Sequence, residues 1–122
     1  MTGSSDDLAD LCAAEKDAFS LCQVALMLDE ARANKDEAAI KAALAINMEL
    51  WVGIRAFAKS PTNGLADVVR GNLITLSQYV GGKTVKQMQG LDDSVLDTLI
   101  NINLQISEGL LEGVNKAAKL AG

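Results

Sequence analysis

The residue types that most often carry catalysis or bind metals are sparse in this chain of 122 residues. The chain has no histidine, the side chain that most often serves as a general base or a metal ligand. Its cysteines, Cys12 and Cys22, fall in one predicted helix, where their spacing corresponds to ~15 Å, too far for a disulfide. Two thiols alone do not make a structural zinc site. We interpret both cysteines as small buried apolar residues, and free thiols are typical of a reducing cytoplasm.

The acidic residues occur in adjacent pairs rather than in clusters spaced for a metal ion. Each pair falls near a predicted helix end or on a polar face, where carboxylates cap helices or remain solvated. None matches the Asp-x-Asp-x-Asp-Gly pattern of a calcium loop. We therefore predict no catalytic, metal or cofactor site and expect that the chain is not an enzyme. The pairs are Asp6-Asp7, Asp29-Glu30, Asp36-Glu37 and Asp92-Asp93.

One glycine-rich segment, residues 81–84, resembles the end of a phosphate-binding loop. The full pattern needs an earlier glycine where Ser77 stands, and a preceding strand, whereas the segment before it has a helical pattern. The basic residues nearby are Lys83 and Lys86, close to Tyr79. This footprint is small for nucleic acid, and a net charge of −5 repels phosphates. Phosphate and nucleic-acid binding are therefore both disfavoured.

Helices must position whatever site exists, because apolar residues recur at steps of three and four along most of the chain. Only 3% of the residues are aromatic, so Leu, Ile, Val and Ala must form most of the core. We predict an all-α, compact bundle of about four helices in one domain, residues 1–122, with fraying near 1–6 and 119–122. The predicted helices cover about 6–33, 34–59, 65–89 and 92–120.

Turn and capping residues set the predicted boundaries. Asn34 is expected to cap the second helix, and Pro61 to end it, because the residue before a proline avoids helical backbone angles. Asp92 or Asp93 is expected to cap the fourth helix. The glycines at 81 and 82 cost ~1 kcal/mol each inside a helix, so the third helix either bends there or continues in weakened form. We favour the continuation.

Each predicted helix carries an apolar stripe that we expect to face the core. The first stripe runs from Leu11 to Leu28, and Phe19 and Leu26 widen it enough for two neighbouring helices. The second stripe consists of Ile40, Ala43, Leu44, Asn47, Trp51, Ile54 and Ala58. The third consists of Leu65, Val69, Leu73, Leu76 and Val80, with Val68, Asn72 and Tyr79 alongside. The fourth consists of Leu96, Leu99, Ile100, Asn103, Ile106, Leu110, Val114 and Ala117.

The fourth helix is apolar over more than half of its circumference. Ile102, Leu104 and Leu111 lie outside its main stripe. Such a helix is either buried on two sides or exposes a surface reserved for a partner. We take these three residues as candidates for partner binding, together with the surface of the first helix.

Three segments, in order, resemble the FlaF family of flagellar biosynthesis regulators. They are ALAINMELW at 43–51, NGLADVVRGNLITL at 63–76 followed by Val80 and Thr84, and LDTLININ at 96–103 followed by Ile106, Gly109 and Leu110. Two features depart from the family pattern. Ala66 stands where FlaF sequences tend to have proline, and the first forty residues match loosely.

The resemblance implies a non-enzymatic, cytoplasmic protein that binds flagellin and supports its production, its export and assembly of the flagellum. It also implies a second regulator, FlbT, working alongside, and no cofactor. The polar, acidic start lacks the pattern of a signal peptide, and no apolar run reaches the ~20 residues that span a membrane. Two alternatives are a translational regulator that contacts flagellin mRNA and a structural helical module that forms a homodimer.

The family-motif residues are expected to be mainly structural. A buried Trp51 would need a hydrogen-bond partner for its indole N–H. The amides of Asn47 and Asn103, if buried, must bond each other or a nearby helix end, and we expect them to fix helix register. The motif residues are Asn47, Leu50, Trp51, Leu65, Arg70, Leu76, Asn103 and Gly109.

Overall fold

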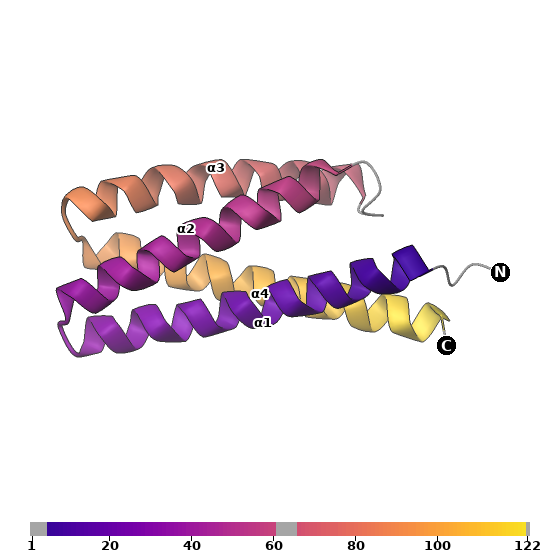
Figure 1. Cartoon of the computed structure of the whole chain (residues 1–122), viewed down its shortest axis with the longest axis horizontal. Coiled ribbons are helices and arrows are strands. Elements are labelled where there is room, and N and C mark those ends of the chain that lie inside the picture. The colour runs from indigo at the N-terminus through magenta and orange to yellow at the C-terminus, as the bar shows by residue number, and fades with distance from the viewer. Residues whose placement is uncertain (1–4, 61–65, 122) are drawn as a thin grey trace.

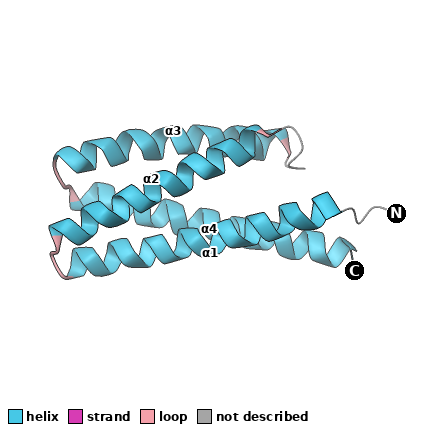
Figure 2. Cartoon of the chain, viewed as in Figure 1, coloured by secondary structure: helices cyan, strands magenta, loops and turns pink. Residues whose placement is uncertain are grey.

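Four antiparallel helices make up the part of the chain that the structure describes. The computed structural model describes residues 5–60 and 66–121, with side chains at 15–60 and 66–112. These residues form helices and no strand (Figure 2), so the predicted all-α bundle of about four helices is confirmed. Of the segments expected to fray, residues 1–4 and 122 lie outside the described part, and the rest are helical. The helices are α1 (Ser5–Ala33), α2 (Glu37–Lys59), α3 (Asp67–Gln89) and α4 (Asp93–Ala121).

The helices pack in a ring with one weakly closed side. Helix α1 packs along both α4 and α2, and α2 packs along α3, whereas α3 and α4 make few contacts. Figure 1 shows the chain alternating in direction, so that α1 begins and α4 ends at the same end of the bundle. Because α2 and α4 lie diagonally opposite, long side chains must fill the space between them.

The turn between α1 and α2 differs from the predicted one. Asn34 continues the end of α1, since its N–H donates to the Glu30 carbonyl at 3.0 Å. Lys35 then adopts a positive φ of 52°. Asp36 is the N-cap of α2, and its carboxylate accepts from the Ala39 N–H at 3.1 Å. The prediction that Asn34 caps α2 was therefore wrong, because Asn34 and Lys35 form the turn and α2 begins two residues later, at the Asp36 cap.

The far end of α2 matches the prediction as far as the described residues allow. The helix ends at Lys59, and Ser60 is extended with φ −65° and ψ 130°, the conformation favoured before proline. Residues 61–65, which include Pro61 and Leu65, lie outside the described part.

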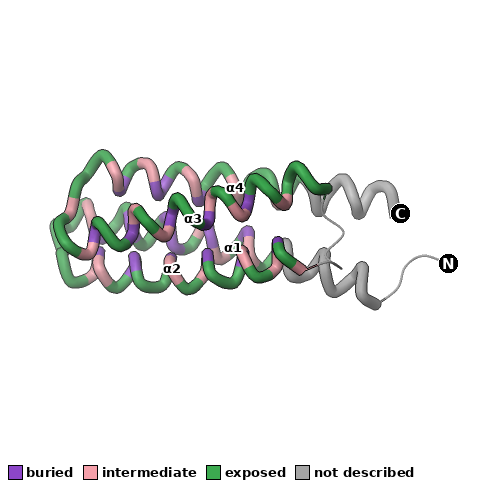
Figure 3. The backbone as a smooth tube through the Cα atoms, turned by 90° about the horizontal axis from the view of Figure 1, so that it is seen from above, coloured by how far each residue is buried: buried purple, intermediate pink, exposed green. Residues whose placement is uncertain are grey.

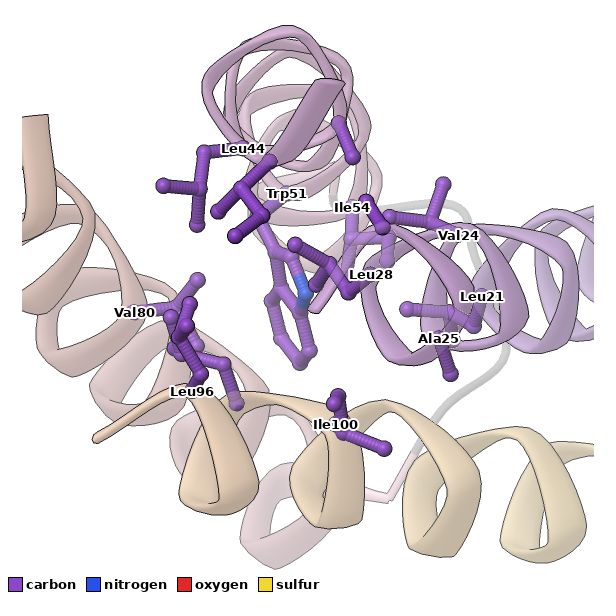
Figure 4. Packing of buried hydrophobic residues seen from close by; sticks show 14 of the residues in the cluster. Leu21, Val24, Ala25, Leu28, Leu44, Trp51, Ile54, Val80, Leu96 and Ile100 are labelled. Atoms are coloured by element: carbon purple, nitrogen blue, oxygen red, sulfur yellow. The ribbon is translucent and has the colours of Figure 1, made fainter. Parts of the chain in front are cut away.

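Helix α2 supplies one wall of the core, and buried residues recur along it between exposed ones (Figure 3). All seven residues of its predicted stripe are buried, including Asn47 at 0% and Trp51 at 1% exposure. On α4, the first four residues of the predicted stripe are buried, Ile106 and Leu110 are partly buried, and Val114 and Ala117 lie outside the described side chains. Figure 4 shows the Trp51 ring extending from α2 toward α4, between side chains of α1 and α3.

The predicted widening of the α1 stripe was wrong. Phe19 and Leu26 are 64% and 62% exposed, whereas Val24 and Ala31 are buried. Helix α2 packs against α1 beside Val24 and Ala31, and α4 packs against it beside Ala18, so neither neighbour covers Phe19 or Leu26. Phe19 and Leu26 are seven residues apart and therefore share one outward face.

Helix α3 contributes an unusually polar wall to the core. Its buried residues are Leu73, Ser77, Val80, Thr84 and Gln87. Of the predicted stripe, Leu73 and Val80 are buried and Leu76 is partly buried, as expected, whereas Val69 is exposed, as are Val68 and Tyr79 beside it. The Ser77 and Thr84 hydroxyls donate to carbonyls of their own helix, each at 2.7 Å, which satisfies both groups. Apolar periodicity found the two apolar residues of this face but could not find its three polar ones.

The glycine pair does not interrupt α3, so the favoured continuation is confirmed. A Cβ at Gly81 would meet only the Met48 sulfur at 3.9 Å, and a Cβ at Gly82 would meet nothing within 4 Å. Lys83 lies over the Tyr79 ring, 5.5 Å from its centroid. Since residues 81–84 are helical, they do not form a phosphate-binding loop.

The start of α4 is fixed by Asp92, one of the two predicted caps. Its carboxylate accepts from the hydroxyl of Ser94 at 2.7 Å and from the Ser94 N–H at 2.9 Å. These hydrogen bonds lower the pKa of the Asp92 carboxyl. The Asp92 N–H in turn donates to the Gln87 side chain at 2.9 Å, which ties the end of α3 to the start of α4.

Candidate functional site

The family-motif amides meet the tryptophan in one buried network. The Asn103 side chain donates to the Asn47 Oδ1 at 2.7 Å, and the Trp51 indole N–H donates to the Asn103 Oδ1 at 2.9 Å. Asn103 Nδ2 also approaches the Leu21 carbonyl at 3.4 Å. The expectation that the amides bond each other and that the indole finds a partner is confirmed. One amide thus links α4 to both α2 and α1, which fixes their register.

The other motif residues lie beside this network or away from it. Leu50 and Leu76 are partly buried and pack against the core. Arg70 is partly buried, and Gly109 is exposed with open space where a Cβ would stand. Leu65 lies outside the described residues. Most of the described motif residues are thus in or next to the packed interior, and they do not line an open pocket.

An open hollow lies instead between α1 and α4, with a volume of about 520 Å³. The helices meet beside it through the Ser107 hydroxyl, which donates to the Ala18 carbonyl at 2.6 Å. Leu26 on α1 and Leu104 on α4 are also exposed, and each lies two helical turns from a lining residue on the same face of its helix, Phe19 and Leu111 respectively. We call the hollow together with Leu26 and Leu104 the α1–α4 groove. The hollow is lined by Glu15, Lys16, Ala18, Phe19, Cys22, Ser107 and Leu111.

Two of the three residues selected on α4 lie along this groove. Leu104 and Leu111 are 40% and 42% exposed and share a face of α4, seven residues apart. Ile102 differs, because it is partly buried and packs against the core, so we leave it out of the groove. Sequence reasoning assigned Phe19 to the core, although it lines the groove. Its position at the edge of the α1 stripe was the only available signal.

The groove can bind apolar side chains but offers few groups for chemistry. Its one hydroxyl, that of Ser107, is already bonded to backbone. Cys22 is a half-buried free thiol, and the side chain of Cys12 lies outside the described part. Across the described residues, no cluster of His, Cys, Asp or Glu could hold a metal ion, and no helix is long and apolar enough to cross a membrane.

One carboxyl group on α1 has an unusual environment. Asp17 lies next to Ala18 on α1 and one turn before the buried Leu21, and it is itself partly buried. Burial raises the pKa of Asp17 above its ordinary value of 3.8, and the nearby charge of Lys16 opposes that effect only in part. The ionised carboxylate is therefore less stable in the folded protein than in the unfolded chain.

Replacing Asp17 with asparagine is expected to raise the melting temperature near neutral pH. Because the folded pKa lies above 3.8, the folded state binds the proton more tightly, and the stability associated with Asp17 falls as pH rises through the folded pKa. Asparagine removes that loss. Thermal melts at about pH 7 and about pH 3 should show the variant's advantage at the higher pH only. A lower melting temperature at neutral pH would mean that the carboxylate makes a favourable contact.

Comparison with known proteins gives one match that covers most of the chain. The family model described as flagellar protein FlaF matches residues 8–110. The matched range contains the buried amide network and every residue of the α1–α4 groove except Leu111, which lies one residue beyond it. No curated protein and no solved structure matches the chain.

Proposed function

Since this chain belongs to the FlaF family of flagellar proteins, we propose that it is a non-enzymatic binding protein for flagellin, with the α1–α4 groove as the docking surface. The family gives the chain its flagellar role. The α1–α4 groove supports a binding function, because it exposes four large apolar side chains, two on each helix. They are Phe19, Leu26, Leu104 and Leu111.

The spacing of these side chains suits an amphipathic helix as the occupant. On each helix, the two exposed residues are two turns apart, or ~10.5 Å. A partner helix that binds along the α1–α4 groove would place its residues i, i+3 or i+4, and i+7 between the exposed side chains of α1 and those of α4. In this proposal, the flagellin segment is such a helix. Covering it in the cytoplasm would shield apolar surface until export, which accounts for support of both flagellin production and flagellum assembly.

Replacing Leu104 or Leu111 with aspartate is expected to weaken flagellin binding while leaving the fold intact. Covering the exposed two-fifths of a leucine contributes roughly 1 kcal/mol, and burying an unpaired carboxylate in its place costs more, so each variant should lose at least roughly tenfold in affinity. Because both side chains are already about two-fifths exposed, the melting temperature should change little. The measurements are the melting temperature and the affinity for purified flagellin, determined for each variant.

Val85→Asp is the matched control. Val85 is 51% exposed on α3, away from the α1–α4 groove. This variant therefore places the same charge on a helix surface without changing the groove. It should bind flagellin like the wild type. If Leu104→Asp or Leu111→Asp melts far lower and keeps its affinity per folded molecule, those leucines support the fold and the groove is not the site.

Light scattering tests whether a second copy of the chain occupies the groove. In our proposal, the wild type without flagellin has the same mass as Leu111→Asp, and only the wild type gains mass when flagellin is added. A wild-type dimer that Leu111→Asp converts to a monomer would assign the groove to self-association.

A further inference from the structure

We propose that the turn between α1 and α2 forms a second docking surface, which accepts an arginine side chain presented by a helix of another partner protein. The site is a hollow of about 220 Å³ on the flank of α1 that faces α2, which we call the α1–α2 hollow. It goes beyond flagellin binding, because it shares no lining residue with the α1–α4 groove.

The hollow has an apolar floor and an acidic rim. Its floor consists of three alanines, Ala31, Ala39 and Ala43, with Met27 at one side. Small side chains leave room for the long apolar stem of an incoming residue. The rim carries the carboxylates of Glu30 and Asp36, and none of the described lining residues is basic.

The neighbouring cations do not neutralise this rim. Arg32 pairs with Asp29 and Asp97, and Lys41 pairs with Glu37 at 3.2 Å. Lys35, in the turn, does not line the hollow. Neither Glu30 nor Asp36 forms an ion pair with any residue that the structure describes. Two carboxylates thus face a small apolar space without a cation of the chain's own.

An arginine side chain fits these features better than other occupants. Its stem packs on apolar surface while its planar head donates to two carboxylates at once. A second copy of this chain is disfavoured, because the two acidic rims and the net charges of −5 would repel each other.

The test uses two synthetic amphipathic helical peptides, identical except for one central residue, which is arginine in the first and citrulline in the second. Citrulline keeps the shape of arginine and removes its charge. Each peptide is titrated into the full-length, ¹⁵N-labelled protein. We expect the arginine peptide to shift the amide signals of Met27, Ala31, Ala39 and Ala43, and to bind at least about tenfold more tightly than the citrulline peptide.

Glu30→Gln should weaken binding of the arginine peptide by about tenfold and leave the melting temperature unchanged, since Glu30 is exposed. Asp36 is unsuitable for this test, because its carboxylate also caps α2. Glu108→Gln, on α4, is the charge-matched control and should bind like the wild type. Equal affinity for both peptides, no effect of Glu30→Gln, or shifts confined to the α1–α4 groove would overturn the proposal.

The two proposed surfaces can fail separately. Leu111→Asp should bind the arginine peptide normally, and Glu30→Gln should bind flagellin normally. If Glu30→Gln loses flagellin and the arginine peptide together, the arginine belongs to flagellin, and the inference of another partner is wrong.

Discussion

Replacing Trp51 with alanine is expected to lower the free energy of unfolding by about 3–5 kcal/mol. Its side chain is 1% exposed and is the largest fully buried side chain among the described residues. It reaches from α2 toward α4, the diagonal of the bundle, where the backbones do not touch (Figure 4). Removing it leaves a cavity on that diagonal and also leaves the Asn103 Oδ1 without its indole donor.

A loss of this size approaches the whole stability of a small domain, typically about 5–15 kcal/mol. The alanine variant should therefore lose its sharp thermal transition. Far-ultraviolet circular dichroism is the suitable probe, because Trp51 is the only tryptophan in the chain and fluorescence disappears with it. Trp51→Phe separates the two contributions. Phenylalanine keeps most of the apolar volume and removes the indole N–H. The free energy of unfolding of Trp51→Phe should therefore lie between that of the wild type and that of Trp51→Ala.

A change below about 1 kcal/mol for Trp51→Ala would contradict the packing described here. It would mean that the tryptophan is solvated in solution. Trp51 would then become a candidate for partner contact.

Helix α2 was predictable from sequence because its environment is uniform. Its seven core residues follow the helical period and all of them are buried. The buried face of α2 can therefore be found without knowing which helices pack against it. Helix α3 was not predictable in the same way. Ser77 and Thr84 satisfy their hydroxyls within their own helix, so they can face the core at little cost while Val68 and Val69 face solvent. A periodicity of apolar residues finds Leu73 and Val80 in such a helix but misses its buried polar residues.

The candidate groove was only half predictable for a related reason. The excess of apolar residues on α4 indicated an open face, and Leu104 and Leu111 are indeed exposed. The opposite wall depends on which side of α1 its neighbours occupy, and a single helix pattern does not contain that information. Phe19 was therefore placed in the core. The α1–α2 hollow likewise exists only because the antiparallel turn brings Met27 near Ala43.

Replacing Asn103 with alanine is expected to destabilise the protein more than replacing Asn47 with alanine, although both amides are 0% exposed. Asn103 serves two partners, since it accepts from the Trp51 indole and donates to the Asn47 Oδ1. Its removal leaves one buried donor and one buried acceptor unsatisfied. At about 1–3 kcal/mol for each unsatisfied group, the cost is about 2–6 kcal/mol.

Asn47 contributes fewer hydrogen bonds. Its Oδ1 accepts from Asn103, whereas its Nδ2 has no hydrogen-bond partner among the described residues. Alanine at position 47 therefore removes one satisfied acceptor and also one buried donor that is already unsatisfied, and these effects partly cancel. The Asn103 Nδ2 keeps its approach to the Leu21 carbonyl at 3.4 Å. We expect a cost of about 1–2 kcal/mol for Asn47→Ala.

Urea unfolding followed by Trp51 fluorescence measures both variants and the double variant on the same scale. The double variant should cost less than the sum of the two single variants, because their shared hydrogen bond is then counted only once. The urea dependence of the unfolding free energy should stay unchanged if the variants keep the native packing. Equal costs for the two single variants, or a strictly additive double variant, would show that Asn103 is not the centre of the network. Its position on α4 would then reflect helix register alone, without a bond that ties α4 to α2.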